Sequence, residues 1–265
     1  MSVIPFKADR FSSTAAHYEH RVPYPSALID EVATRIGLKP GDAVLDLGCG
    51  PAQLGIAFAR LGMRVIAMDP EPGMLSVAAA AARRAGVDIV LQQGSSYDLS
   101  PALGTFKLVV MGRAFHWMDR PATLAVLDTM IEPDGAVVLV HDRRAAATPD
   151  WPGVVASLSA RFVPKPPEGE PTHHAANWIP HEVPLLQSKF SAVETMGRVF
   201  ARTLSIDDLV GRVYSMSVTS PEVLGERRAA FEAELRSELA GLAAGGSLSE
   251  MVTVEAMLAF RPTAE

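Results

Sequence analysis

The stretch 44–54 constrains the fold more strongly than any other part of this chain. It reads Val-Leu-Asp-Leu-Gly-Cys-Gly-Pro-Ala-Gln-Leu, an apolar run that ends in a glycine turn and continues into an apolar helical pattern over 51–61. A second apolar run, 65–69, ends in an acid, Asp69, nineteen residues after Gly50. Apolar runs of this length are typical of parallel strands buried on both faces. A glycine turn followed by an acid at the next strand tip predicts a doubly wound α/β sheet that holds a nucleoside by its ribose.

The glycine turn does not match the dinucleotide fingerprint Gly-x-Gly-x-x-Gly/Ala, because Gln53 stands at its third glycine position. The pattern Asp-x-Gly-x-Gly-x-Ala at 46–52 instead resembles motif I of the class I S-adenosylmethionine-dependent methyltransferases, whose commonest form is Asp/Glu-x-Gly-x-Gly-x-Gly. The resemblance implies a Rossmann-like seven-stranded sheet with an antiparallel last strand. It implies S-adenosyl-L-methionine as the cofactor, contacted by Asp46, Gly48, Gly50 and Asp69. A packing turn without a ligand is the alternative.

The segment 16–25 places two tyrosines, an arginine and two prolines ahead of a helical pattern at 26–36. It is similar to the segment that folds over the cofactor in small-molecule methyltransferases of the trans-aconitate and ubiquinone-menaquinone groups. The resemblance implies that Tyr18 and Arg21 contact the cofactor, Arg21 through a bidentate contact with the methionine carboxylate. A loop that leaves Arg21 in solvent is the alternative.

Two further segments contribute expected cofactor contacts through the same resemblance. Met74 opens an alanine-rich helix and corresponds to a position that flanks the adenine ring; a core methionine is equally plausible. Ser95 stands where related enzymes usually have an aspartate that accepts from the adenine amino group, so Ser96 or Tyr97 is expected to share this contact.

The segment 112–119 follows an apolar strand pattern and resembles motif IV of the family in its His-Trp form. Ligands of such sheets sit outside the carboxyl ends of the strands, so this segment is expected to line the methyl-transfer side. His116 is the first candidate base, and His141, at the end of the next strand, is the second. Arg113 is a candidate contact to cofactor or substrate. Packing roles for these residues are the alternative.

Composition limits the partners of the chain. With 265 residues and a net charge of −6, a nucleic-acid partner is not expected. No apolar run is long enough for a membrane span, and charged residues appear by position 7, which argues against a signal peptide. The single cysteine, Cys49, excludes internal disulfides and favours the cytoplasm. No metal is expected, because His173, His174 and His181 match no standard zinc spacing.

We expect four regions. They are a covering segment at 1–37, the cofactor-binding core at 38–142, a proline-rich inserted cap over the active site at 143–190, and the C-terminal part of the core sheet with helices at 191–265. The expected function is in-line SN2 transfer of a methyl group to an O, N or C nucleophile of a small molecule, such as a natural-product intermediate of secondary metabolism. A non-catalytic cofactor-binding member and an NAD(P)-dependent oxidoreductase are the alternatives, and both a monomer and a homodimer remain open.

Overall fold

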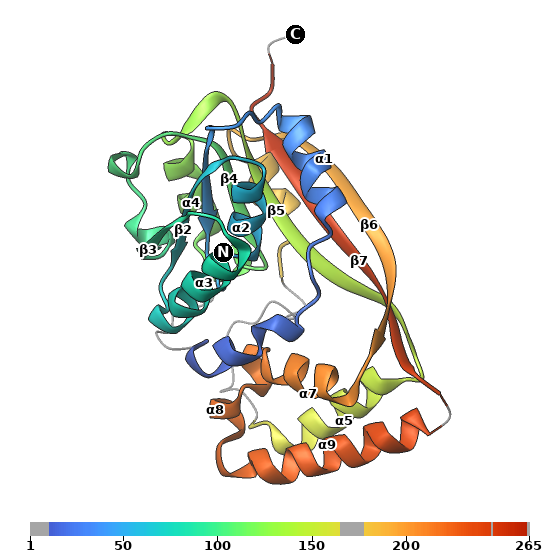
Figure 1. The fold of residues 1–265 in the computed structure, drawn as a ribbon. Helices are drawn as coiled ribbons and strands as arrows, with labels where there is room; N and C mark the ends of the chain where they lie inside the picture. The colour runs from blue at the N-terminus through green and yellow to red at the C-terminus, as the bar shows by residue number, and fades with distance from the viewer. Residues whose placement is uncertain (1–10, 165–177, 245, 264–265) are drawn as a thin grey trace.

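The computed structural model describes residues 11–164, 178–244 and 246–263. Within these residues seven strands form one sheet in the order β3-β2-β1-β4-β5-β7-β6 (Figure 1). The strands are β1 (Ala43–Leu47), β2 (Arg64–Asp69), β3 (Val90–Gln93), β4 (Phe106–Gly112), β5 (Ile131–Thr148), β6 (Ala192–Leu204) and β7 (Leu248–Phe260). Strands β1 to β5 run parallel, and β7 is antiparallel to both β5 and β6. The predicted Rossmann-like sheet with an antiparallel last strand is confirmed.

The helices alternate with the strands in the first half of the chain and cluster after β5. They are α1 (Ser26–Ile36), α2 (Gln53–Arg60), α3 (Pro72–Ala85), α4 (Arg120–Leu127), α5 (Trp151–Phe162), α6 (Glu182–Leu186), α7 (Ile206–Tyr214), α8 (Pro221–Leu224) and α9 (Arg228–Ala243). Within the described ranges, none of the helices has the length and apolar character needed to cross a membrane.

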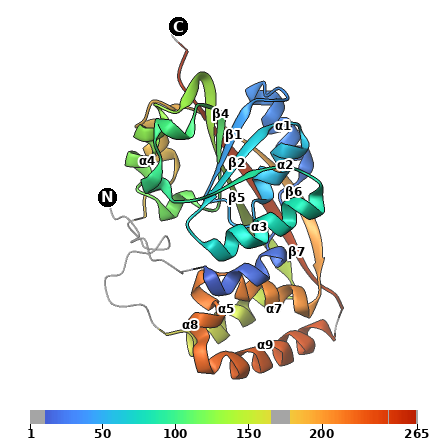
Figure 2. The same ribbon diagram turned by 60° about the vertical axis from the view of Figure 1, so that its left-hand side comes forward.

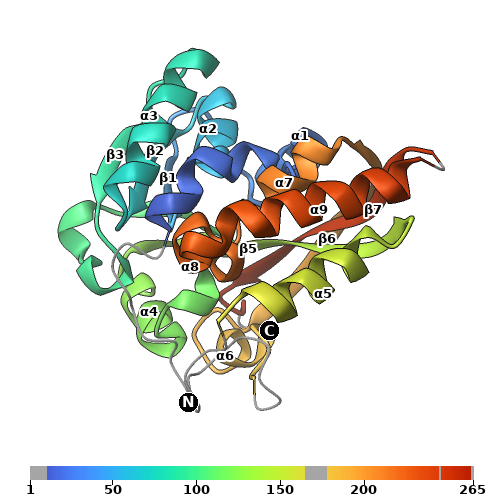
Figure 3. The same cartoon turned by 90° about the horizontal axis from the view of Figure 1, so that it is seen from below.

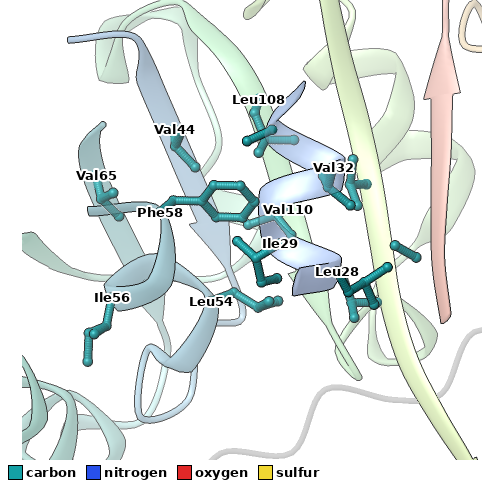
Figure 4. Close-up of a cluster of buried hydrophobic side chains, with 14 of the residues drawn as sticks. Leu28, Ile29, Val32, Val44, Leu54, Ile56, Phe58, Val65, Leu108 and Val110 are labelled. Carbon is teal, nitrogen blue, oxygen red and sulfur yellow. The ribbon is translucent and has the colours of Figure 1, made fainter. Parts of the chain in front are cut away.

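Helices α1, α2 and α3 cover one face of the sheet (Figure 2). Their apolar residues recur at helical spacing, so that one side of each helix meets the strands. Figure 4 shows Ile29 of α1 and Phe58 of α2 packed over Val44 and Val110 of the central strands. Helices α4 and α6 cover the opposite face, where Leu124 joins a second buried cluster. Both faces of the central strands are therefore buried, as their continuous apolar runs require.

The last three strands of the sheet continue well beyond this three-layer core. Helices α5, α7 and α9 pack across the extended ends of β5, β6 and β7 (Figure 3). Trp151, Tyr214 and Phe231 fill a third hydrophobic cluster there, and each is nearly or fully buried. This helical layer combines one helix that follows β5 with two that follow β6, so two separate stretches of the chain build it.

The segment before α1 joins the core to this helical layer. Its 3₁₀ helix, Ser12–His20, lies between α3 and α7 (Figures 1 and 2). His20 Nδ1 lies 3.4 Å from Asp208 Oδ1 on α7, and Arg21 Nη2 donates to the carbonyl of Ser215 at 2.7 Å. The segment is thereby held across the carboxyl ends of the strands.

Two predicted boundaries, at residues 51 and 143, were wrong. The helix expected at 51–61 begins only at Gln53, because Ala52 has a left-handed backbone conformation that a helix cannot contain. Helix α4 ends at Leu127, and β5 begins at Ile131. Helices α8 and α9 are separated by a break at Gly225, whose φ is +53°. Residues 143–148, expected to open the cap, instead extend β5 because β7 continues to pair with them.

Candidate active site

Three adjoining cavities open where β1, β2 and β4 end. The main cleft has an empty volume of about 810 Å³, including its space open to solvent, which is the size of an ordinary small-molecule site. Nine of the residues singled out in the sequence line it: Tyr18, Gly48, Gly50, Asp69, Met74, Ser95, Ser96, Tyr97 and Arg113. A larger chamber and a small pocket share walls with this cleft, and the four remaining candidates lie there.

The glycine turn forms one wall of the cleft. The N–H groups of Gly48 and Cys49 both donate to the carbonyl of Met68, at 2.8 and 3.0 Å, which ties the turn to β2. Gly48 has a φ of +69°, and a Cβ there would lie 2.6 Å from the Cβ of Ala114. Only glycine therefore fits this position. Ala52 shares the left-handed conformation with a φ of +57°, which explains why the related motif has a glycine at this place.

Asp69 connects the glycine turn to the start of α3. Its Oδ2 accepts from the N–H of Gly50 at 2.8 Å, and its Oδ1 accepts from the N–H of Glu71 at 3.0 Å. Burial raises the pKa of this carboxyl, although the two backbone donors counteract that effect. Each oxygen keeps further lone pairs for a ligand hydroxyl, since a carboxylate can accept about four hydrogen bonds. Asp69 can therefore support the turn and still receive a ribose.

Asp46 lies beneath the turn and is almost fully buried. Its Oδ2 accepts from the N–H of Gly55 in α2 at 2.8 Å, and burial raises its pKa to about 7. The residue borders the small pocket beside the turn, together with Tyr18, Tyr24 and Arg113. Asp46 therefore lines the small pocket and not the main cleft.

The far side of the cleft is formed by α3 and by the segment after β3. Met74 is 1 % exposed and faces the cleft. Ser95 caps the short turn that follows: its hydroxyl donates to Asp98 Oδ2 at 2.9 Å and accepts from the N–H of Tyr97 at 3.3 Å. The hydroxyl of Ser95 is therefore already engaged, whereas the ring of Tyr97 is largely exposed at the edge of the cleft.

Arg113 borders all three cavities and has a left-handed backbone, with a φ of +56°. Such strain in a residue other than glycine is concentrated at functional sites. Its guanidinium pairs with Asp142 and donates to the carbonyl of Val22 at 2.6 Å, while its Cζ lies 4.5 Å from the ring centre of Tyr24. Burial opposes the charge of Asp142, but Arg113 outweighs it and holds the pKa of Asp142 below its usual range.

The larger chamber lies between the carboxyl ends of the strands and the helical layer. Its empty volume is about 1210 Å³, again including space open to solvent, and Arg21, His116 and His141 line it. Arg21 lines the chamber and does not line the main cleft. Tyr18 and Arg113 stand at the boundary, because both border the cleft and the chamber.

The two candidate bases have different surroundings. His141 Nε2 lies 3.1 Å from Glu255 Oε2, and the two residues are direct partners in the β5–β7 pairing. His116 stands in a short 3₁₀ turn with its ring centroid 4.6 Å from that of Trp117 and 6.3 Å from that of His181. His181 Nδ1 in turn lies 3.2 Å from Arg120 Nη1. Each histidine is thus oriented by the fold beside the chamber.

The described part of the chain contains no group of three or more His, Cys, Asp or Glu side chains placed to hold a metal ion. His173 and His174 lie outside the described residues. His181 is engaged with Arg120 and with aromatic rings.

Several lining residues have no counterpart in the sequence prediction. Phe11 packs edge-on against Trp117, with ring centroids 5.5 Å apart, at the boundary between cleft and chamber. Glu71 is 4 % exposed and lines the cleft two residues after Asp69, a position that a search for a second acid could have found. Arg212 lines the chamber from α7, far away in the sequence, and no local signal marks it.

Comparison with known proteins finds a methyltransferase domain in the chain. Residues 44–135 match the family described as "Methyltransferase domain". The chain is 33% identical over 153 residues to the ubiquinone biosynthesis O-methyltransferase of Xanthomonas campestris pv. campestris (strain B100), a match that covers 57% of this chain and 62% of that protein. The chain therefore spans about three fifths of the length of the curated relatives it matches.

Solved structures share the fold across almost the whole chain. A SAM-dependent methyltransferase from Thiobacillus denitrificans, in complex with S-adenosyl-L-homocysteine, is 16% identical with a TM-score of 0.53, covering 94% of this chain and 98% of its own. A second such complex, from Geobacter sulfurreducens, is 18% identical with a TM-score of 0.51, covering 96% and 99%. At these identities the likeness concerns the fold. The match at 44–135 identifies a methyltransferase domain in this chain, and the seven-stranded sheet around it has the fold of solved SAM-dependent methyltransferases.

Proposed function

We propose that this protein transfers the methyl group of S-adenosyl-L-methionine to an O, N or C atom of a small molecule. The observation that carries the proposal is the continuity between a nucleoside-sized cleft at the glycine turn and a chamber that holds two histidines. Cleft and chamber share Tyr18, Arg113 and Trp117, so a ligand in one can meet a ligand in the other. A protein that only bound the cofactor in the cleft would not need the adjoining chamber.

The residues of the cleft fit the cofactor. Gly48 leaves bare backbone where a Cβ would intrude on Ala114, Gly50 has a left-handed φ of +53°, and Asp69 has acceptor capacity left for two ribose hydroxyls. Met74 and the turn at 95–97 would hold the adenine end, and Asp46 would act from the small pocket. When bound, the cofactor supplies a methyl group already activated by its sulfonium.

The residues of the chamber would orient the acceptor, exclude water and take up its proton. Phe11, Trp117 and the 3₁₀ helix before α1 cover the junction, so the reacting atoms would be aligned in a desolvated space. His141 is the better oriented candidate base, because a carboxylate beside Nε2 fixes its ring and leaves Nδ1 as a proton acceptor. His116 is the second candidate. A base is required only if the acceptor arrives protonated.

Among acceptors, we propose a natural-product intermediate, with the reaction in the cytoplasm. The chamber, with His181, Arg212 and Met216 in its wall, has an empty volume of about 1210 Å³ including space open to solvent, which would hold a bulky ring system. The acidic net charge of −6 disfavours a nucleic-acid substrate.

Two measurements test the proposal. Calorimetric titration should give micromolar binding of S-adenosylhomocysteine and none of NADH; the reverse result would favour an oxidoreductase. Incubation of a panel of phenols, amines and carboxylic acids with methyl-labelled cofactor should then label at least one acceptor. Cofactor binding without labelling across all three classes would favour a non-catalytic member.

A further inference from the structure

The chamber is positively charged within an acidic protein. Four arginines line it, whereas Asp142 is its only acidic lining residue among those described. The arginines are Arg21, Arg113, Arg144 and Arg212. The chain as a whole has a net charge of −6, so this charge is a local feature.

Carboxylates in and behind the chamber wall form ion pairs with three of these four arginines. The side chain of Glu250 is 0% exposed and lies 2.5 Å from Arg212 Nη1, 3.0 Å from Arg202 Nη1 and 3.5 Å from Arg144 Nε. One carboxylate therefore serves three guanidinium groups. Asp142 pairs with Arg113 and lies 3.7 Å from Arg212 Nη2, and Glu255 is engaged with a histidine.

Arg21 is the one of these four arginines that forms no ion pair with these acids. Within the described residues, no carboxylate lies within 4 Å of its guanidinium. Its Nη2 donates to the carbonyl of Ser215, and its Cζ lies 5.2 Å from the ring centre of Tyr18. Its Nε is shielded from solvent and has no hydrogen-bond partner. A buried N–H without an acceptor destabilises a fold, so such a group calls for an explanation.

We infer that the acceptor carries a carboxylate group and that Arg21 receives it in the chamber. This inference rests on the proposed function and names the chemical class of its acceptor. A carboxylate in the chamber would pair with the guanidinium of Arg21, which has no carboxylate partner among the described residues, and it matches the planar donor fork of arginine. The positive chamber would also attract an anionic acceptor into an otherwise acidic protein.

The position of Arg21 separates this carboxylate from the methyl-transfer point. Arg21 lines the chamber but neither the cleft around Asp69 nor the small pocket at the glycine turn, whereas Arg113 borders all three. The carboxylate held by Arg21 is therefore a recognition group, and a different atom of the acceptor is methylated. The methionine carboxylate of the cofactor is the other possible partner, and the test distinguishes the two.

The test is calorimetry on the full chain saturated with S-adenosylhomocysteine. The probes are two matched pairs, 4-hydroxybenzoate with 4-hydroxybenzamide, and 3-phenylpropanoate with 3-phenylpropanamide. We expect at least one carboxylate to bind the wild type ten-fold or more tightly than its amide, and this preference to disappear in Arg21→Gln. Arg21→Lys should keep part of it. Arg143→Gln, at an exposed arginine of β5 outside the chamber, is the matched control and should keep all of it.

Three outcomes would overturn the inference. They are equal affinity for acid and amide in both pairs with the wild type, an undiminished preference in Arg21→Gln, and a ten-fold loss of S-adenosylhomocysteine affinity in Arg21→Gln. The last would assign Arg21 to the cofactor. The wild-type comparison stands even if Arg21→Gln does not fold. Failure of the wild type to bind S-adenosylhomocysteine would instead contradict the proposed function, and the acid–amide titration without cofactor would still test Arg21.

Discussion

Asp46 offers a sharp test of the electrostatics beneath the glycine turn. The residue is 1 % exposed, and its Oδ2 accepts a hydrogen bond from the N–H of Gly55. Burial raises the pKa of Asp46 from 3.8 to about 7, and the nearby charge of Asp69 adds to the effect. The substitution Asp46→Asn keeps the shape and an oxygen for the N–H of Gly55 but removes the titration.

The pH dependence follows from the proton that the folded protein retains. Between pH 3.8 and 7 the folded state keeps the proton on Asp46, whereas the unfolded chain releases it. The contribution to the free energy of unfolding is therefore fully present below pH 3.8 and is lost as the pH rises through 7. At about 1.4 kcal/mol per pKa unit, the total loss is about 4 kcal/mol, of which about 3 kcal/mol falls between pH 5 and pH 8.

Urea unfolding of both proteins at pH 5, 6, 7 and 8 measures this effect. The stability of Asp46→Asn relative to the wild type should rise by about 3 kcal/mol from pH 5 to pH 8. Any cost of burying the amide is independent of pH and cancels from the trend. Asp88→Asn, at an exposed aspartate far from the turn, is the matched control.

A constant stability difference between wild type and Asp46→Asn across this pH range would refute the reasoning. It would mean that Asp46 is ionised in the folded protein at pH 5, and hence that water or a cation reaches the carboxylate.

Three further predictions concern the site. Asp69→Ala should weaken S-adenosylhomocysteine binding in calorimetry, since each hydrogen bond to a charged acceptor contributes about 1.5–3 kcal/mol, and should also lower stability in urea because two backbone N–H groups lose their acceptor; unchanged affinity would remove the ribose role. His141→Ala should lower turnover far more than His116→Ala, with cofactor affinity intact in both variants, and a His141→Ala variant as fast as the wild type would exclude His141 as the base. Glu255→Gln should lower kcat about ten-fold without changing cofactor affinity, because His141 loses the carboxylate that orients it; an unaltered kcat would make the pair purely structural.

Local sequence signals were enough to predict the architecture. Buried parallel strands need continuous apolar runs, and the sharp turn after β1 needs a glycine at position 48, so both features are visible in the chain itself. The acid at the tip of β2 was equally visible, and it lies against the N–H of Gly50. These signals involve residues close in sequence or at fixed strand positions. Which of the predicted residues contact the cofactor remains a prediction.

Helix boundaries and the helical layer were not visible in this way. The left-handed conformation of Ala52 has no marker in an alanine, and it shifts the start of α2. The extension of β5 to Thr148 depends on β7, which pairs with it from more than a hundred residues away. The secondary structure of such stretches depends on which distant residues pair with them, and the local sequence does not reveal those partners.

The sequence by itself therefore determined the wound sheet, its glycine turn and the acid beside it, because backbone geometry and burial of single strands dictate those residues locally. Only the tertiary structure decided the chamber. It brought Glu255 to His141 across 114 positions and set Arg21 against Ser215 across 194 positions, leaving its Nε without an acceptor. Charges and hydrogen bonds of this kind depend on distance in space, and chain folding alone sets that distance.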